Sequence, residues 1–216
     1  MINLLIFDHD MTLVDSSDAI LAGVNLLADV VGKPHANHSQ VMRCIAMPLT
    51  QFMEELFGEC RPEWLDIYRQ KVAPLEFEHI HAFPETGPVL TRLREMGVHL
   101  GVASNRQDPH RAMEKSNTAR YFDPGTILGP ADKVPHKPHP AMIESLMEHF
   151  GVPCSETAYV GDSDIDIRTA LAAGVRAIGI TRGYFTREQF SELGAWRTID
   201  SLTELLSLVR DGTEKE

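Results

Sequence analysis

Residues 2–16 read INLLIFDHDMTLVDS, an apolar run that ends in paired acids. The run itself, Ile2–Phe7, is typical of a strand that is buried on both faces of a sheet. Asp8 and Asp10 follow it directly. Ligand sites of parallel sheets lie just beyond the carboxyl ends of the strands, so we expect both carboxylates at such a site. Two close carboxylates repel each other unless a cation such as Mg²⁺ lies between them, and an acidic cap on the following helix is the alternative interpretation.

Short apolar runs and helix-like stretches alternate through much of the remaining chain. The strand-like runs are Val98–Ala103, Thr157–Val160 and Val175–Ile180, and apolar residues recur at helical spacing over Thr86–Met96, Pro140–Phe150 and Ile165–Ala173. This alternation predicts an α/β fold, with a Rossmann-like parallel sheet and helices on both of its faces. Two capping boxes, Thr186-x-x-Gln189 and Ser201-x-x-Glu204, predict that later helices begin there.

One segment interrupts the alternation. From Asp15 to Ala82 there is no strand-like run, although the segment is far longer than the roughly 30 residues of a complete βαβ unit. Helical spacing of apolar residues appears over Ser16–Val31, Ser39–Ala46, Leu49–Phe57 and Pro62–Val72. We therefore predict a helical cap domain over residues 15–82, inserted into a core that is formed by residues 1–14 and 83–216.

Composition and charge exclude several classes of protein. The formal net charge of −11 argues against a protein that binds the nucleic-acid backbone, because such a protein presents a basic face. No apolar stretch approaches the roughly 20 residues of a membrane span, and the N-terminus lacks a basic leader. Cys44, Cys60 and Cys154 form no CxxC pair, which favours reduced thiols. We therefore expect a cytoplasmic protein, a monomer or homodimer, without a nucleic-acid or membrane partner.

Three further segments place polar residues next to predicted strands or helices. Ser104 and Asn105 follow the second strand-like run, Lys137 lies in HKPHP before a helix, and residues 161–166 read GDSDID after the third run. Taken singly, these are a turn, a solvated lysine and an acidic helix start. Because parallel strands end at the same edge of a sheet, their order indicates one common site for a phosphate and a metal ion.

The order of these motifs resembles that of the haloacid dehalogenase-like (HAD) hydrolase superfamily, and within it the C1-capped, phosphoglycolate phosphatase-like group. The four motifs are DxDxT at residues 8–12, Ser104, Lys137 in KPHP, and the acidic segment 161–166. The resemblance implies a Mg²⁺-dependent phosphatase that hydrolyses a small phosphorylated metabolite, such as phosphoglycolate or a similar phosphomonoester. A pyrophosphatase or a sugar-phosphate mutase shares all four motifs and is the alternative. A signalling receiver domain or an inactive relative fits the insertion and the intact acids less well.

The resemblance also implies roles for the acids. Asp8 is the nucleophile that attacks phosphorus and forms an aspartyl-phosphate. Asp10 protonates the leaving alkoxide and then deprotonates the water that hydrolyses the intermediate. Mg²⁺ lies between the Asp8 carboxylate, the Asp10 backbone carbonyl and Asp162, while Asp164 is expected to be only a solvated acid. Relatives that cleave carbon–halogen bonds or phosphonates usually lack an acid at the position of Asp10, so its presence favours phosphate esters or anhydrides.

The remaining roles concern the phosphoryl group. The resemblance implies that Ser104, the Asn105 backbone N–H and Lys137 donate to the phosphoryl oxygens, and that Thr12 supports the phosphate-binding loop. Asp166 orients Lys137 or a water bound to the metal ion.

Two residues depart from the family pattern, and the cap holds the candidates for substrate choice. Met11 stands where glycine is frequent, and its side chain is expected to exclude conformations that only glycine tolerates. His9 is expected to be packed and hydrogen-bonded rather than catalytic. Arg43 is our candidate for binding a substrate carboxylate or a second phosphate, with solvated surface charge as the alternative for all the basic residues of the cap, which are Lys33, Arg43, Arg69 and Lys71.

Overall fold

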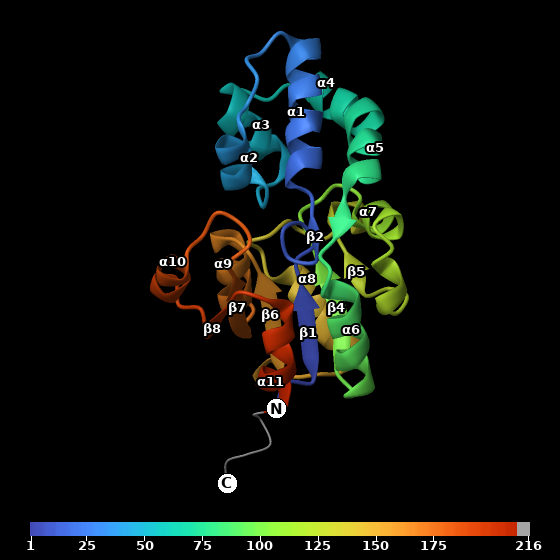
Figure 1. Ribbon diagram of the computed structural model, residues 1–216, viewed down its shortest axis with the longest axis vertical. Helices are drawn as coiled ribbons and strands as arrows, with labels where there is room; N and C mark the ends of the chain where they lie inside the picture. The colour runs from blue at the N-terminus through green and yellow to red at the C-terminus, as the bar shows by residue number, and fades with distance from the viewer. Residues whose placement is uncertain (211–216) are drawn as a thin grey trace.

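The computed structural model describes residues 1–210 of the chain. In it, the apolar runs form one parallel sheet (Figure 1). Its strands are β1 (Leu4–Phe7), β4 (His99–Ala103), β5 (Ile127–Leu128), β6 (Thr157–Gly161), β7 (Arg176–Ile180) and β8 (Arg197–Ile199). They lie in the order β5-β4-β1-β6-β7-β8, and every neighbouring pair is parallel. The first strand is therefore central, with β4 and β6 on its two sides. The predicted α/β class and parallel sheet are confirmed.

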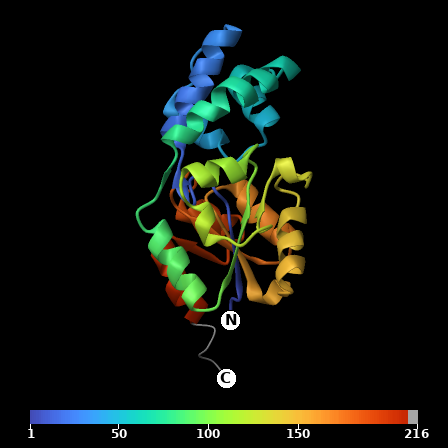
Figure 2. The same cartoon turned by 90° about the vertical axis from the view of Figure 1, so that its right-hand side faces the viewer.

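Helices cover both faces of the sheet. They are α6 (Thr86–Glu95), α7 (Pro109–Lys115), α8 (Ala141–Phe150), α9 (Asp164–Ala172), α10 (Arg187–Glu192) and α11 (Leu205–Arg210). Alternate residues of β1 point to opposite faces: Leu5 belongs to the apolar cluster with Leu90 of α6, and Leu4 to the cluster with Ile143 of α8. Figure 2 shows α6 and α11 on one side of the sheet and α8 on the other. Within residues 1–210, no helix is both long and apolar enough to cross a bilayer.

The insertion between β1 and β4 is helical, as predicted, and lies above the carboxyl ends of the strands (Figure 1). It contains α1 (Ser17–Val31), α2 (His38–Cys44), α3 (Leu49–Phe57), α4 (Pro62–Ile67) and α5 (Ala73–Glu76). One helix was expected over Pro62–Val72, but α4 passes into a π-helical turn at Tyr68–Val72. The turn ends just before Pro74, which has no N–H to continue the α-helical pattern.

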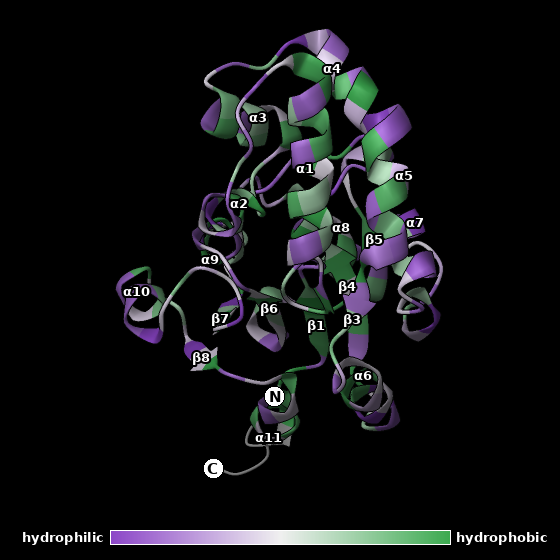
Figure 3. Cartoon of the chain, turned by 45° about the horizontal axis from the view of Figure 1, so that its top comes forward, coloured by the Kyte–Doolittle hydropathy of each residue, from purple (hydrophilic) through white to green (hydrophobic). Residues whose placement is uncertain are grey.

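Two short antiparallel strands connect the insertion to the sheet. In this pair, β2 (Val14–Asp15) lies beside β3 (His81–Ala82), with Val14 opposite Ala82. No strand was expected between Asp15 and Ala82. The sequence does not indicate β3, because this strand is only two residues long, is exposed and contains no apolar run. Figure 3 shows β3 as hydrophilic, whereas β1 and β4 are hydrophobic. The boundaries predicted for the cap domain fall in this strand pair, and the division into two domains stays a prediction.

Candidate active site

A tight loop carries the first two acids away from the end of β1. The Asp8 backbone N–H donates to the Val160 carbonyl at 2.8 Å, which holds the start of the loop against β6. The His9 carbonyl accepts the N–H of Leu13 at 3.0 Å, which closes the loop. Met11 has a left-handed backbone with φ 56°. Residues other than glycine also adopt this region, at a cost of about 1–2 kcal/mol relative to glycine, so the structure does not contradict the expectation that the Met11 side chain excludes conformations that only glycine tolerates.

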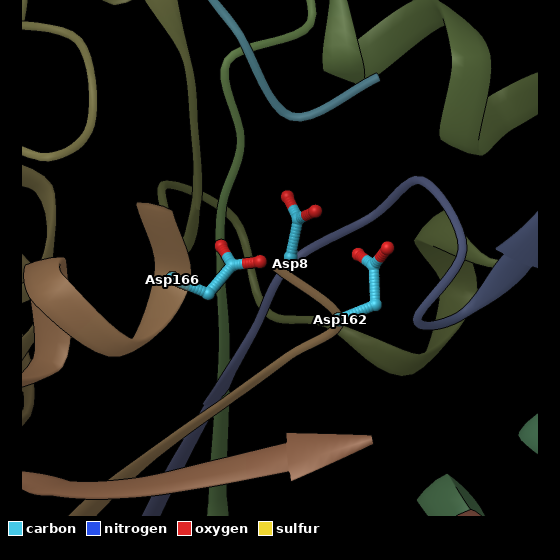
Figure 4. Close-up of side chains that lie close together, drawn as sticks. All are labelled: Asp8, Asp162 and Asp166. Atoms are coloured by element: carbon cyan, nitrogen blue, oxygen red, sulfur yellow. The ribbon is translucent and has the colours of Figure 1, made fainter. Parts of the chain in front are cut away.

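Three buried carboxylates gather at the carboxyl edge of the sheet. Asp8 follows β1, Asp162 follows β6 and Asp166 lies in α9, and each offers an oxygen within 4.8 Å of the others (Figure 4). Burial raises the pKa of Asp8 from 3.8 to about 7, against the opposing charge of Lys137. Burial, followed by the charges of Asp166 and Asp8, raises the pKa of Asp162 well above its usual value. The cluster therefore holds more negative charge than its surroundings neutralise.

The donor set fits a hard divalent cation. Oδ1 of Asp162 is buried and has no hydrogen-bond partner among residues 1–210. A buried carboxylate oxygen without a partner is costly, and a cation that accepts oxygen ligands removes that cost. Carboxylate oxygens are the ligands that Mg²⁺ prefers. Gly183 lies against this side chain, because a Cβ there would collide with the Asp162 carboxylate. Asp8 and Asp162 are thus suited to hold the metal ion.

Lys137 is the cation of this cluster. Its side chain is buried, and Nζ donates to Asp8 Oδ1 at 2.7 Å, to Asp166 Oδ1 at 2.7 Å and to the Tyr159 hydroxyl at 2.9 Å. Burial alone would lower the pKa of Lys137, but the Asp166 and Asp8 carboxylates raise it above its usual value. The Lys137 backbone N–H donates to the Asn105 side chain at 2.8 Å, which fixes the loop. Lys137 is therefore positively charged and aimed at Asp8.

Asp166 uses both of its oxygens inside the protein. Oδ1 accepts hydrogen bonds from Lys137 and, at 3.1 Å, from the Tyr159 hydroxyl. Oδ2 accepts from the Ser163 backbone N–H at 3.0 Å and from the Ser163 hydroxyl at 2.6 Å, as part of the capping box that begins α9. Asp166 lies near enough to hold a metal ion with Asp8 and Asp162, but these four bonds suit it better to positioning Lys137.

The other residues predicted to bind phosphate lie close by. Ser104 and Asn105 are buried directly after β4, and the Asn105 amide donates to the carbonyls of Ala46 and Lys137. The hydroxyl of Thr12 is buried and makes no hydrogen bond with the described part of the chain. His9 is packed, as expected, but neither ring nitrogen has a hydrogen-bond partner among the described residues. Its Nδ1 only approaches Asp10 Oδ1, at 3.5 Å, so the expected hydrogen bond is absent.

Asp10 belongs to a second buried network, which links the core to the insertion. Arg106 donates to both Asp10 oxygens, from Nε to Oδ2 at 2.9 Å and from a terminal nitrogen to Oδ1 at 2.8 Å. The same guanidinium reaches Glu76 of α5 at 3.3 Å, and Glu76 accepts the Tyr68 hydroxyl at 2.7 Å. Burial would raise the pKa of Asp10, but Arg106 and His9 hold it well below its usual value. Asp10 is therefore ionised in this arrangement.

Comparison with known proteins agrees with this geometry. The family model described as haloacid dehalogenase-like hydrolase matches residues 5–180. The chain belongs to this family. A phosphoglycolate phosphatase from Vibrio parahaemolyticus is 30% identical and covers 96% of both chains. Another from Pseudomonas syringae pv. tomato is 29% identical over 94% of this chain and 78% of its own length. A solved haloacid dehalogenase-like hydrolase from Bacteroides fragilis superposes with a TM-score of 0.86, at 28% identity, over 95% of this chain and 100% of that one.

The protein is thus a HAD-family hydrolase of the phosphoglycolate phosphatase-like group, and its helical insertion is consistent with a C1 cap. Sequence reasoning did not find Arg106, Glu76 or Tyr68. Arg106 is adjacent to the Ser-Asn motif, which is the one signal that could have pointed to it. Nothing in the sequence marks Glu76 or Tyr68, because their place beside Arg106 depends on how the cap packs against the core.

A cavity of about 370 Å³ lies between this cap and the core, beside Asp10. Of the basic cap residues singled out from the sequence, Arg69 lines it, whereas Lys33, Arg43 and Lys71 are not among its described lining residues. The Arg43 guanidinium instead lies 5.8 Å from the centre of the Tyr184 ring. Its role in binding substrate stays a prediction.

Proposed function

We propose that this HAD-like hydrolase is a Mg²⁺-dependent phosphatase that hydrolyses a small phosphomonoester, phosphoglycolate or a similar metabolite, through an aspartyl-phosphate on Asp8. One observation carries the proposal: the buried Asp8 carboxylate lies between Lys137, at 2.7 Å, and Asp162, one of whose oxygens has no partner among the described residues. The phosphatase relatives support the reaction class. The site thus combines a nucleophile, a fixed cation and ligands for a metal ion.

The Asp8 carboxylate is placed to attack phosphorus. One of its oxygens accepts a hydrogen bond from Lys137, and no hydrogen bond within residues 1–210 occupies the other. Attack by that oxygen forms the aspartyl-phosphate and breaks the bond from phosphorus to the leaving alkoxide oxygen. Asp8, Asp162 and the Asp10 backbone carbonyl would hold a Mg²⁺ ion, whose positive charge would offset the repulsion between the carboxylate and the phosphate. Lys137 adds a second positive charge on the same side.

Asp10 then moves the protons of both half-reactions. It gives a proton to the leaving alkoxide, which departs as the alcohol. It takes a proton from the water that attacks the phosphorus of the aspartyl-phosphate, and inorganic phosphate leaves while Asp8 is restored. Because Arg106 holds Asp10 in its ionised form, this ion pair has to open before Asp10 carries the proton.

Donors surround the expected place of the phosphoryl group. We propose that the Ser104 hydroxyl, the Asn105 backbone N–H and Lys137 stabilise the charge that develops on its oxygens. Thr12, whose hydroxyl has no hydrogen-bond partner within residues 1–210, supports the same loop. We further propose that the protein works in the cytoplasm, as a monomer or homodimer.

Phosphate release from a panel of phosphomonoesters, pyrophosphate and sugar phosphates tests the proposal, with and without Mg²⁺. We expect turnover of phosphomonoesters that needs Mg²⁺ and is lost in Asp8→Asn. Turnover that does not need Mg²⁺ would contradict the proposed chemistry. A mutase reaction without phosphate release would replace the phosphatase assignment.

A further inference from the structure

The cavity beside Asp10 is large for the alcohol that phosphoglycolate would release. Its volume of about 370 Å³ corresponds to on the order of a dozen water molecules, at roughly 30 Å³ each. Glycolate has two carbons and would leave most of this space unfilled. The volume falls within the range of pockets that bind ring-sized ligands.

The position of the cavity identifies the part of the substrate that it receives. Asp10 and Asn105 line it, whereas Asp8, Lys137 and Asp162 are not among its described lining residues. It therefore opens on the side of the phosphoryl site where Asp10 lies. In the proposed reaction Asp10 protonates the leaving oxygen, so the cavity holds the alcohol rather than the phosphoryl group.

The cap side of the cavity is apolar. Its wall includes Ile20 of α1, Ile45 and Met47 between α2 and α3, Phe52 of α3, and Phe77 after α5. Such a wall favours a ligand that brings its own apolar surface, because both surfaces leave water on binding. A ring-sized hydrocarbon group meets this condition, and a two-carbon group does not.

The rim of the cavity carries more positive than negative charge. Arg106 is already paired with Asp10 and Glu76. Two other lining arginines are exposed. Arg69 lies 3.6 Å from the exposed carboxylate of Asp66, and Arg111 of α7 lies 5.3 Å from the centre of the Phe77 ring.

Among residues 1–210, no carboxylate forms an ion pair with the Arg111 side chain, although its charge helps to lower the pKa of the nearby Glu78. The remaining lining acid, Asp108, is used to cap α7, where it accepts the Arg111 backbone N–H at 3.0 Å. In Figure 1, α7 lies just below α5, at the junction of cap and core. The Arg111 guanidinium, which is exposed and forms no ion pair within residues 1–210, therefore favours an anion at this rim.

We infer that the preferred substrate is the phosphate ester of a bulky, mostly apolar alcohol that carries a second anion, such as a carboxylate, and that Arg69 and Arg111 bind this anion. The inference rests on the proposed function and names the class of leaving group. The apolar part packs against the cap wall beside Phe52 and Met47, and the anion lies at the exposed rim.

Four phosphate esters of primary alcohols separate size from charge: ethyl phosphate, phosphoglycolate, benzyl phosphate and 4-carboxybenzyl phosphate. With Mg²⁺ present, we expect kcat/KM to be highest for 4-carboxybenzyl phosphate, and at least about tenfold above phosphoglycolate. We also expect kcat/KM to be higher for benzyl phosphate than for ethyl phosphate, because the apolar cap wall favours a larger apolar group even without a second anion.

Variants separate the contribution of the rim arginines from that of the apolar cap wall. Arg111→Gln and Arg69→Gln should lower kcat/KM for 4-carboxybenzyl phosphate about tenfold and leave benzyl phosphate within about twofold. Arg92→Gln, on an exposed face of α6 away from the cavity, is the matched control and should change neither. Met47→Trp fills part of the cavity at a half-buried position and should lower kcat/KM for both benzyl esters more than for phosphoglycolate.

The outcomes separate the inference from the proposed function. Hydrolysis with phosphoglycolate as the best of the four esters overturns the inference and leaves the phosphatase intact. So does an unchanged ratio of 4-carboxybenzyl to benzyl phosphate in Arg69→Gln and Arg111→Gln. If none of the four esters is hydrolysed in the presence of Mg²⁺, the proposed function and the inference both fail.

Discussion

The carboxyl edge of the sheet and the cavity under the cap have opposite charge balances. At the edge, three buried carboxylates lie close together, and two of them, Asp8 and Asp166, pair with Lys137. Among the residues that line the cavity, arginines outnumber acids, and most of the others are apolar. Asp10 stands between the two regions, next to the acids in sequence but bound to Arg106 in space. The two regions differ in the charge that would suit them: the edge suits a cation together with the phosphoryl group, and the cavity rim suits the second anion proposed for the substrate.

The largest expected effect comes from removing the nucleophile at the edge. We expect Asp8→Asn to lower kcat by about 10⁴-fold or more, because the amide oxygen does not form the aspartyl-phosphate. Asp164→Asn is the matched control, since Asp164 is a neighbouring acid of α9 that pairs with Arg168 and should be dispensable. Steady-state kinetics with Mg²⁺ measures both. Substantial activity in Asp8→Asn would remove Asp8 from the proposed role.

The second largest effect is expected from Glu76, in the buried network that links the insertion to Arg106 and Asp10. Burial raises the pKa of Glu76 from 4.5 to about 7, although the facing Arg106 and the Tyr68 hydroxyl oppose this and Asp10 adds to it. The folded state therefore binds a proton more tightly than the unfolded state. As the pH rises from 4.5 to 7, Glu76 alone should lower the free energy of unfolding by about 3 kcal/mol, at about 1.4 kcal/mol per pH unit.

Glu76→Gln should lack the part of the fall that comes from Glu76 and keep the part that comes from Asp8 and Asp162. Urea unfolding at pH 5 and pH 8 measures the difference between the wild type and the variant at each pH. Glu78→Gln is the control: Glu78 is exposed, and its hydrogen bond with Lys115 lowers its pKa, so it cannot produce a fall in this direction. The same pH dependence in Glu76→Gln as in the wild type would mean that Glu76 is not the group responsible.

Metal binding tests the edge from the other side. We expect Mg²⁺ to raise the free energy of unfolding by about 2.7 kcal/mol at one hundred times its Kd, and chelation to abolish turnover. Asp162→Asn should be at least as stable as the wild type without metal, because it removes a buried charge beside Asp8 and Asp166, and should gain little from Mg²⁺. Thermal unfolding with and without Mg²⁺ measures this. An equal gain in both proteins would place the ion elsewhere.

The smallest effect is expected at the cap surface. Arg43→Gln removes the contact between the Arg43 guanidinium and the exposed Tyr184 ring, which should lower the free energy of unfolding by about 0.5–1 kcal/mol. Urea unfolding measures that change, and Tyr184→Leu should reproduce it. A rise in KM in Arg43→Gln that Tyr184→Leu does not share would support the role in substrate binding that the sequence suggested.

The edge of the sheet was predictable because each of its residues stands at the end of an apolar run or at the start of a helix. Asp8, Ser104 and Asp162 follow buried strands, and parallel strands bring their ends together whatever the distance in sequence. This explains why the motifs alone indicated both the fold and the place of the site.

The cavity was not predictable in the same way. Arg106, Glu76 and Tyr68 meet only because the cap packs onto the core, and no periodicity encodes such a contact. The strands β5 and β8 were missed because they are two and three residues long and partly exposed. The left-handed backbone of Met11 was missed because the surrounding loop, not the residue type, imposes it.

The paired strands β2 and β3 bring the two ends of the helical insertion together. Val14 pairs with Ala82 and Asp15 with His81, so the chain leaves the sheet and returns to it at neighbouring points. A segment of another length whose ends meet equally closely could therefore join these points and leave the order β4-β1-β6 unchanged. Doubling the length of such a segment adds only about 0.6 kcal/mol of closure entropy. A different insertion could therefore change which leaving groups fit the cavity, while the residues proposed to act on the phosphoryl group stay the same.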